Sequence, residues 1–217
     1  MISDLNLLIG TTIVVVMLYM CYNYYYCSTY NTSNVKSRSD GKYYKIHNHH
    51  SQKQFAADTL GYLNSKINQL KLYMKNNMSR YTPEQKNATQ RILDLYNPDN
   101  LVENSPLSKY TSYVVDKGEK IAICLREVEK ASNAGEESYV VHGYNVLTFV
   151  VYHEIAHISI PDKGHPLKFW QAFKFILQEA QKGGIFVSKD YEKYPIHYCG
   201  MYLDYNPIYD KTLTVLR

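Results

Sequence analysis

The stretch YNVLTFVVYHEIAH, residues 144–157, decides how this chain is interpreted. It is apolar almost all round up to its two histidines, which predicts a helix buried in the core of a domain. Residues four positions apart lie on one face of a helix, so His153 and His157 can present two imidazoles to one tetrahedral zinc ion. Glu154 lies next to the first histidine, where it can reach a zinc-activated water rather than the metal. The stretch therefore predicts a hydrolytic zinc site with Glu154 as general base.

Two histidines leave such a site incomplete, because a catalytic zinc ion usually has three protein ligands and one open position. We predict His165 as the third ligand, since Pro161, Asp162 and Gly164 favour a turn that folds it back under the metal. The other possible third ligands are His142, His197 and, as an acidic ligand, Glu179. The alternative to a metal site is a buried helix whose polar side chains are satisfied by core hydrogen bonds. Burying two histidines and a glutamate in that way would be costly.

The residues around this stretch predict further helices. Apolar residues recur at three- and four-residue steps over residues 55–74, which predicts an amphipathic helix. The triplet Thr82-Pro83-Glu84 is typical of a helix start, and the residues around Pro98 end that second helix. A last helix is expected to begin at Pro166 and to end at Gly183-Gly184.

Short strands are expected between these helices. Residues 110–115 and 120–125 are rich in β-branched and aromatic side chains and are joined by Asp116-Lys117-Gly118-Glu119, which predicts a hairpin. Residues 139–142 are expected to form a third strand. The aromatic, turn-rich tail after residue 190 is expected to pack against the core. The fold class is therefore α+β, with one domain over residues 55–217.

The N-terminal residues suggest a membrane anchor. Residues 5–21 are mostly apolar, and the chain carries no charge between Asp4 and Lys36, so residues 1–27 are predicted to be a transmembrane helix with an interfacial flank. A signal peptide and a buried helix are the alternatives. Basic residues follow the segment and none precede it, which predicts a single-pass protein with a cytosolic C-terminal domain. The polar residues 28–54 are expected to form a flexible linker.

The cysteines and the net charge exclude some classes of protein. The four cysteines include no CxxC pair, which excludes a cysteine-based zinc ribbon, and their low density predicts isolated thiols in a reducing compartment. The formal net charge of +4 comes without a dense basic stripe, so a nucleic-acid partner is unsupported.

The motif His153-Glu154-Ile155-Ala156-His157, followed by Gly164-His165-Pro166-Leu167-Lys168-Phe169-Trp170, resembles the WLM family of zinc peptidases and its SprT-like relatives. Those families carry a HELxH motif, a third histidine, and an aromatic residue about four positions after it. Weaker similarity covers the strand 121–126 and the helix around residues 56–60, so that the resemblance spans about residues 55–182. It extends to membrane-anchored versions in large DNA viruses, with which the abundance of Tyr, Asn and Lys is compatible.

The resemblance implies a zincin-like fold, a bound Zn²⁺ and hydrolysis of peptide bonds in a protein or peptide substrate. With the predicted anchor, the expected protein is a peptidase tethered to a host or virion membrane. Two alternatives remain open. One is a catalytically silent virion or membrane structural protein that retains the zinc fold, and the other is a DNA-associated protease acting on DNA-bound proteins.

Overall fold

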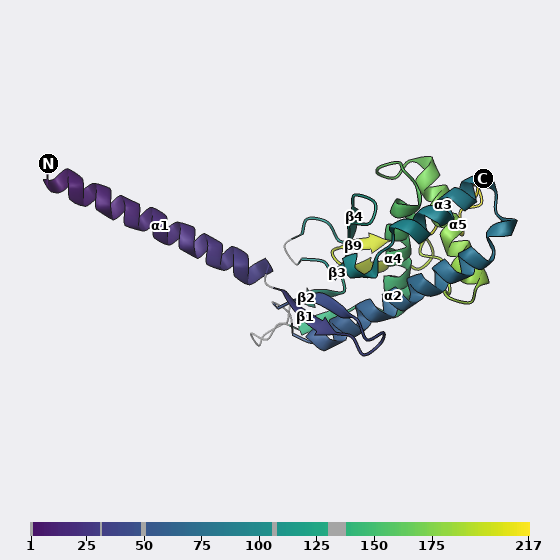
Figure 1. The fold of residues 1–217 in the computed structure, drawn as a ribbon, viewed down its shortest axis with the longest axis horizontal. Helices are drawn as coiled ribbons and strands as arrows, with labels where there is room; N and C mark the ends of the chain where they lie inside the picture. Colours follow the sequence, from purple (N-terminus) through teal and green to yellow (C-terminus); the bar gives the residue numbers. More distant parts are fainter. Residues whose placement is uncertain (1, 31, 49–50, 106–107, 130–137) are drawn as a thin grey trace.

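The computed structural model describes residues 2–30, 32–48, 51–105, 108–129 and 138–217 (Figure 1). Its helices are α1 (Ile2–Tyr30), α2 (Lys53–Asn76), α3 (Pro83–Leu95), α4 (Tyr144–Ser159) and α5 (Leu167–Lys182), with short 3-10 turns at Met78–Arg80 and Pro98–Asn100. Its strands are β1 (Thr32–Lys36), β2 (Tyr43–His47), β3 (Leu101–Glu103), β4 (Tyr113–Val115), β5 (Lys120–Ile123), β6 (Arg126–Glu129), β7 (Ser138–Val141), β8 (Ile196–Tyr198) and β9 (Met201–Leu203). The described elements form an α+β fold.

The N-terminal helix α1 corrects the prediction of a membrane anchor. Figure 1 shows α1 extending away from the other elements. Within the described ranges, no helix is both long enough and apolar enough to span a bilayer. The apolar run of α1 is diluted by Asn6, Thr11 and Thr12 and is followed by a tyrosine-rich stretch, whereas a spanning helix needs about 20 predominantly apolar residues. The predicted transmembrane helix over residues 1–27, and with it the single-pass membrane localisation, is wrong.

Much of the predicted flexible linker is structured. Strands β1 and β2 pair antiparallel, with Thr32 opposite His47 and Lys36 opposite Tyr43. Side chains alternate along β2, so that Tyr44 and Ile46 are buried while Tyr43 and Lys45 are exposed. The hairpin contacts α2 and β3. The linker prediction is therefore wrong for residues 32–47, because burial of Tyr44 and Ile46 against neighbouring elements holds the hairpin although the segment is polar on average.

The predicted helices of the body are confirmed, and α4 is their centre. Every residue of α4 from Val146 to Tyr152 is buried. Helices α2, α3 and α5 pack around α4, which also contacts β4 and β5. The start of α3 has the full capping box, since the Thr82 side chain accepts from the Gln85 backbone N–H and the Gln85 side chain accepts from the Thr82 backbone N–H. The helix that carries the paired histidines is thus held on several sides.

The predicted hairpin is formed by β4 and β5, and it belongs to a three-stranded sheet in the order β3-β5-β4. Strand β3, which was not predicted, pairs parallel with β5. The connecting turn has positive φ at Asp116, Lys117 and Gly118. Glycine is required at the last position, where φ is +122° and a Cβ would lie 2.8 Å from the carbonyl oxygen of Leu95. The predicted third strand is β7, which pairs antiparallel with β6, and the tail forms the β8–β9 hairpin.

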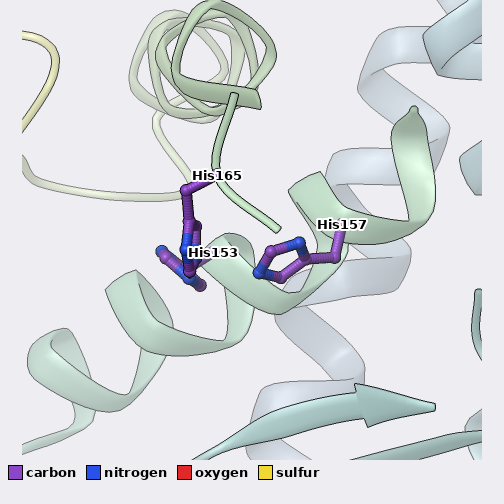
Figure 2. Close-up of side chains that lie close together, drawn as sticks. All are labelled: His153, His157 and His165. Carbon is purple, nitrogen blue, oxygen red and sulfur yellow. The ribbon is translucent and has the colours of Figure 1, made fainter. Parts of the chain in front are cut away.

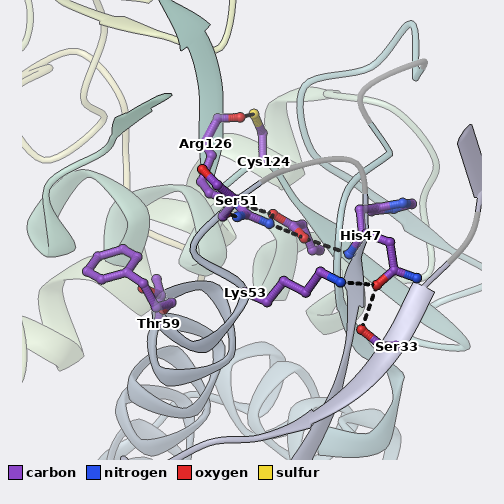
Figure 3. A network of polar contacts seen from close by, with 10 residues as sticks. Ser33, His47, Ser51, Lys53, Thr59, Cys124 and Arg126 are labelled. Carbon is purple, nitrogen blue, oxygen red and sulfur yellow. Dashed lines mark hydrogen bonds and ion pairs between the residues drawn. The ribbon is translucent and has the colours of Figure 1, made fainter. Parts of the chain in front are cut away.

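A buried ion pair joins these small sheets. Arg126 on β6 makes a two-pronged contact with Glu103 on β3, with Nε–Oε1 and Nη2–Oε2 distances of 2.8 and 2.9 Å. Glu103 also accepts a hydrogen bond of 2.9 Å from the backbone N–H of His47, at the end of β2. Arg126 donates in addition to the carbonyl oxygen of Ser51 (Figure 3). Both charged side chains are buried, so each depends on the other for compensation.

A disulfide links Cys124, which follows β5, to Cys199 in the β8–β9 turn. The bond joins residues that are 75 positions apart in sequence and fastens the C-terminal hairpin to the sheet. The prediction of isolated thiols is therefore wrong for these two cysteines. The positions of these cysteines in the sequence did not indicate a disulfide, because only the folded chain brings the two Cα atoms to 6.5 Å.

Candidate active site

The C-terminal end of α4 is fixed by two cations from neighbouring elements. Arg91 on α3 donates from Nε to the carbonyl oxygen of Ile158 at 3.2 Å. Lys117, in the β4–β5 turn, donates from Nζ to the carbonyl oxygen of His157 at 3.0 Å and also to that of Asp162. The last carbonyls of a helix have no partners within the helix and carry partial negative charge. Lys117 therefore joins the end of α4 to the loop that follows it.

Three imidazoles meet beside this helix end. Figure 2 shows His153 and His157 from α4, and His165 from the loop between α4 and α5, pointing toward one another. The Nε2 atoms of His153 and His165 are 3.0 Å apart, and one ring nitrogen from each of the three histidines lies within 4.8 Å of the others. Gly164, with φ of +71°, provides the turn immediately before His165. The structure thus brings together the three histidines that the sequence singled out as zinc ligands.

One aromatic side chain supports all three imidazoles. Phe169, in the first turn of α5, is fully buried, and its ring centroid lies 4.8, 4.3 and 4.6 Å from those of His153, His157 and His165. The ring of His157 stacks on it, with an interplanar angle of 29°. The helix that follows the third histidine therefore supplies a packed wall, which restricts the rotamers of the histidines before any ligand binds.

Burial sets the protonation of the three histidines. The pKa of His157 is lowered to about 4, first by burial and then by the nearby His165 and Lys117. The pKa of His153 is lowered well below its usual value by burial and by the two other imidazoles, and burial also lowers the pKa of His165. All three rings are therefore neutral near pH 7, which is the form that binds a metal ion.

Burial favours the neutral form of Glu154 as well. Its side chain is buried, and desolvation raises its pKa to about 8. Among the described residues, none makes a hydrogen bond to its carboxylate. A carboxyl group in this state can hold or release a proton near neutral pH, as a general base requires.

The histidines and Glu154 lie in a cleft with a volume of about 970 Å³. One wall is the strand β4, whose residues Tyr113, Val114 and Val115 all line the cleft. The strand pairs with β5 on one side, and among the described strands its other edge has no partner, so that this free edge adjoins the cleft that all three of its residues line. The rim is basic, with Lys109, Lys117, Lys120 and Lys163 against one acidic rim residue, Asp116.

The geometry of the three histidines fits a zinc ion. Zinc–nitrogen bonds of 2.0–2.1 Å in a tetrahedral site place ligand nitrogens about 3.3 Å apart. The observed 3.0 Å between His153 Nε2 and His165 Nε2 needs only a small expansion to reach that value. Three neutral imidazoles are also a donor set expected of a catalytic zinc site. The adjacent carboxyl group of Glu154 lies outside that set.

The other residues considered as third ligands lie elsewhere. Glu179 accepts from Tyr81 Oη at 2.7 Å and pairs with Lys182 at 2.6 Å, on the far part of α5. His142 and His197 both approach Glu127, with nitrogen–oxygen distances of 3.6 and 3.1 Å. Those two histidines therefore belong to a separate cluster, and His165 alone among these candidates joins the pair on α4.

This chain is similar to proteins of two viruses. It is 34% identical over 177 residues to "Uncharacterized protein R325" of Acanthamoeba polyphaga mimivirus, and the match covers 79% of this chain and 82% of the relative. The chain belongs to the R325 family. A further relative, "Uncharacterized protein 136R" of Invertebrate iridescent virus 6, is 31% identical over 96 residues, which are 44% of this chain and 50% of that protein. No family model matches this member of the R325 family, and no solved structure matches it.

Sequence reasoning missed residues that hold the three histidines of this chain in place. Lys117 and Arg91 act through backbone carbonyls, and such contacts leave no motif in the sequence. The edge position of β4 was also not predicted, because it depends on the parallel partner β3 on the far side of β5. Gly118 was the one sequence signal for the tight β4–β5 turn, and this turn places Lys117 beside α4.

Proposed function

We propose that this chain is a zinc-dependent peptidase, with His153, His157 and His165 as the metal ligands and Glu154 as the general base. The observation that carries the proposal is the convergence of three neutral imidazoles beside a buried carboxyl group on the floor of an open cleft. The resemblance of the same residues to the WLM and SprT-like motif supports it from the sequence. A buried carboxyl group with a purely structural role would normally have a hydrogen-bond partner, and in the part of the chain that the structure describes Glu154 has none.

The roles of the residues follow from their chemistry. A bound zinc ion would supply Lewis acidity, lowering the pKa of a water molecule toward 7 and polarising the scissile carbonyl. Glu154 would take the proton of the attacking water and pass it to the leaving amine. Phe169 and Lys117 would keep the imidazoles and the His165 loop in position. The apolar surroundings of Glu154 would keep its proton affinity matched to neutral pH.

The substrate would bind along β4. An extended peptide can add to an exposed strand edge through backbone hydrogen bonds, and here that edge faces the histidines across the cleft. The four rim lysines would favour peptides with acidic side chains. Since Tyr110 and Tyr113 also line the cleft, apolar or aromatic side chains can be accommodated between the lysines.

Hydrolysis of a quenched-fluorescence peptide library by the full-length protein tests this proposal. We expect cleavage by the zinc-loaded wild type, faster for acidic than for basic peptides, and loss of cleavage on chelation or in His157→Ala. Retention of zinc without cleavage of any peptide would instead support the catalytically silent scaffold. The rim lysines also favour a second candidate, a protease that acts on DNA-bound proteins. For that candidate, single-stranded DNA should bind with a steep salt dependence and stimulate cleavage.

A further inference from the structure

A second cluster of metal-ligating side chains lies outside the His153, His157 and His165 site. It consists of Glu127 on β6, His142 immediately after β7, and Cys199 in the β8–β9 turn, with Cys124 disulfide-bonded to Cys199. His142 Nε2 lies 3.3 Å from Cys199 Sγ and 3.6 Å from Glu127 Oε1. Three separate chain segments therefore direct a nitrogen, a sulfur and an oxygen at one point.

The two distances from His142 are close to those between ligands of a tetrahedral zinc ion. With zinc–sulfur bonds of about 2.3 Å and zinc–nitrogen or zinc–oxygen bonds of about 2.0–2.2 Å, a sulfur and a nitrogen ligand lie about 3.5 Å apart, and a nitrogen and an oxygen about 3.4 Å. A disulfide alone has no need of a buried imidazole and a carboxylate beside it. His142 is buried, and Glu127 is held by a second histidine, His197, whose Nδ1 lies 3.1 Å from Glu127 Oε1.

We propose that reduction of the Cys124–Cys199 disulfide creates a second, structural zinc site whose ligands are Cys124, Cys199, His142 and Glu127. In the disulfide form Cys124 Sγ lies outside the group of three ligand atoms, and after the sulfur–sulfur bond breaks it would supply the fourth ligand that closes the shell, as in structural zinc sites. His197 orients the carboxylate of Glu127 from outside that shell. With the disulfide intact the sulfurs are not thiolates, so the site binds zinc only in the reduced protein.

The reaction balances as a thiol–disulfide exchange followed by metal binding. A dithiol transfers two electrons and two protons to the disulfide, so that the sulfur–sulfur bond breaks, two cysteine thiols form and the dithiol becomes a disulfide. Zinc binding then displaces the two thiol protons to solvent. The Cys124 and Cys199 side chains remain joined in both states, first covalently and then through the metal.

This exchange would keep the C-terminal hairpin fastened in oxidising and in reducing surroundings. Next to Cys199, the buried Tyr198 donates from Oη to the carbonyl oxygen of Cys124 at 2.8 Å and lies 2.9 Å from Ser112 Oγ. Ser112 lines the cleft. Loss of both fastenings would therefore free a hairpin that packs behind the cleft wall.

Cobalt(II) binding to the full-length protein tests the proposal, because a thiolate ligand gives a charge-transfer band in the near ultraviolet that imidazoles and carboxylates do not give. We expect the band in wild type reduced with a phosphine, and its absence in the oxidised protein and in the Cys124→Ser/Cys199→Ser double variant. Cys21→Ser, which alters an exposed free thiol, should keep the band. His157→Ala should also keep it, which separates this site from the proposed catalytic one.

A second measurement does not depend on folding of the double variant. Limited proteolysis of reduced wild type should cut the β8–β9 hairpin at least several-fold faster with a chelator than with zinc, whereas the oxidised protein should be insensitive to the chelator. Reduced wild type without a thiolate band, or a band that persists in the double variant or in His142→Gln, would overturn the proposal.

Discussion

Lys117 Nζ lies 3.0 Å from the carbonyl oxygen of His157, and the same ammonium group donates to the carbonyl oxygen of Asp162. One residue of the β4–β5 turn thus holds both the end of the helix that carries two of the predicted ligands and the loop that carries the third. The contact is made to backbone atoms, so it fixes the position of the imidazoles without touching them. Its loss should affect metal binding more than folding.

We therefore expect Lys117→Ala to weaken zinc binding by about 10- to 100-fold, the range found when groups that support metal ligands are removed. Zinc titration against a competing chelator measures the change. Lys120→Ala is the matched control, because Lys120 also lies on the rim but, among the described residues, its ammonium group contacts only Tyr113, whose hydroxyl lies at 2.9 Å. Equal affinities for the two variants would show that Lys117 does not position the site.

Glu154→Gln should separate metal binding from catalysis. The substitution keeps the shape of the side chain but removes the proton acceptor, so zinc content should stay at the wild-type level while peptide hydrolysis falls by about 10²- to 10⁴-fold. Metal analysis and hydrolysis rates on the same preparation measure both. Loss of zinc together with activity would instead identify Glu154 as a ligand.

Between about pH 6.5 and 8, above the range in which the buried histidines take up protons on unfolding, the metal-free protein should lose stability as the pH rises, because of Glu154. Its pKa is about 8 in the folded chain, above the ordinary value of 4.5 for a glutamate side chain. A raised pKa in an acid contributes stability that is fully present below about pH 4.5 and is lost as the pH rises through about 8. The slope is at most about 1.4 kcal/mol per pH unit in that window.

Urea unfolding in the presence of a chelator measures this slope in wild type and in Glu154→Gln. The histidines titrate in both proteins, so the difference between the two slopes reports on Glu154 alone. Parallel slopes would mean that the carboxyl group is not desolvated in the folded state.

The buried pair Glu103–Arg126 should be more important for stability than exposed ion pairs. Glu103→Gln leaves the buried guanidinium without its charge partner, which we expect to lower the free energy of unfolding by about 3–5 kcal/mol. Asp99→Asn, which breaks an exposed contact of 3.9 Å with Lys42, should change it by less than about 1 kcal/mol. Denaturant unfolding measures the free energy of unfolding of both variants. Equal losses in Glu103→Gln and Asp99→Asn would contradict the role given to the buried pair.

The sequence predicted the helices of the body because their apolar periodicity and caps are local signals. The residues Thr82-Pro83-Glu84 predict the start of α3, and the capping box is present in the structure. The turn before His165 was equally local, with Gly164 at positive φ. The three histidines could therefore be chosen before their distances were known, whereas Phe169 was singled out only by the resemblance to the WLM and SprT-like motif.

The short strands and the disulfide could not be predicted in this way. Strand β3 has only three residues, and its parallel partner β5 lies 20 positions later in the chain. The disulfide partners Cys124 and Cys199 are 75 positions apart. Residues 28–54 are polar on average, yet Tyr44 and Ile46 are buried against α2 and β3. The N-terminal apolar run misled for the opposite reason, since apolar residues between Leu5 and Cys21 were weighed more heavily than the polar residues among them.

The zinc content of the oxidised full-length protein tests the central claim most directly. Elemental analysis should find one zinc ion per chain in wild type and in His197→Ala, whose side chain lies in the separate Glu127 cluster. The ion should be absent from His157→Ala and from His165→Ala, both checked for folding by circular dichroism. A folded wild-type protein without zinc, or one that keeps its zinc in both of the last two variants, would contradict the assignment of His153, His157 and His165 as a metal site.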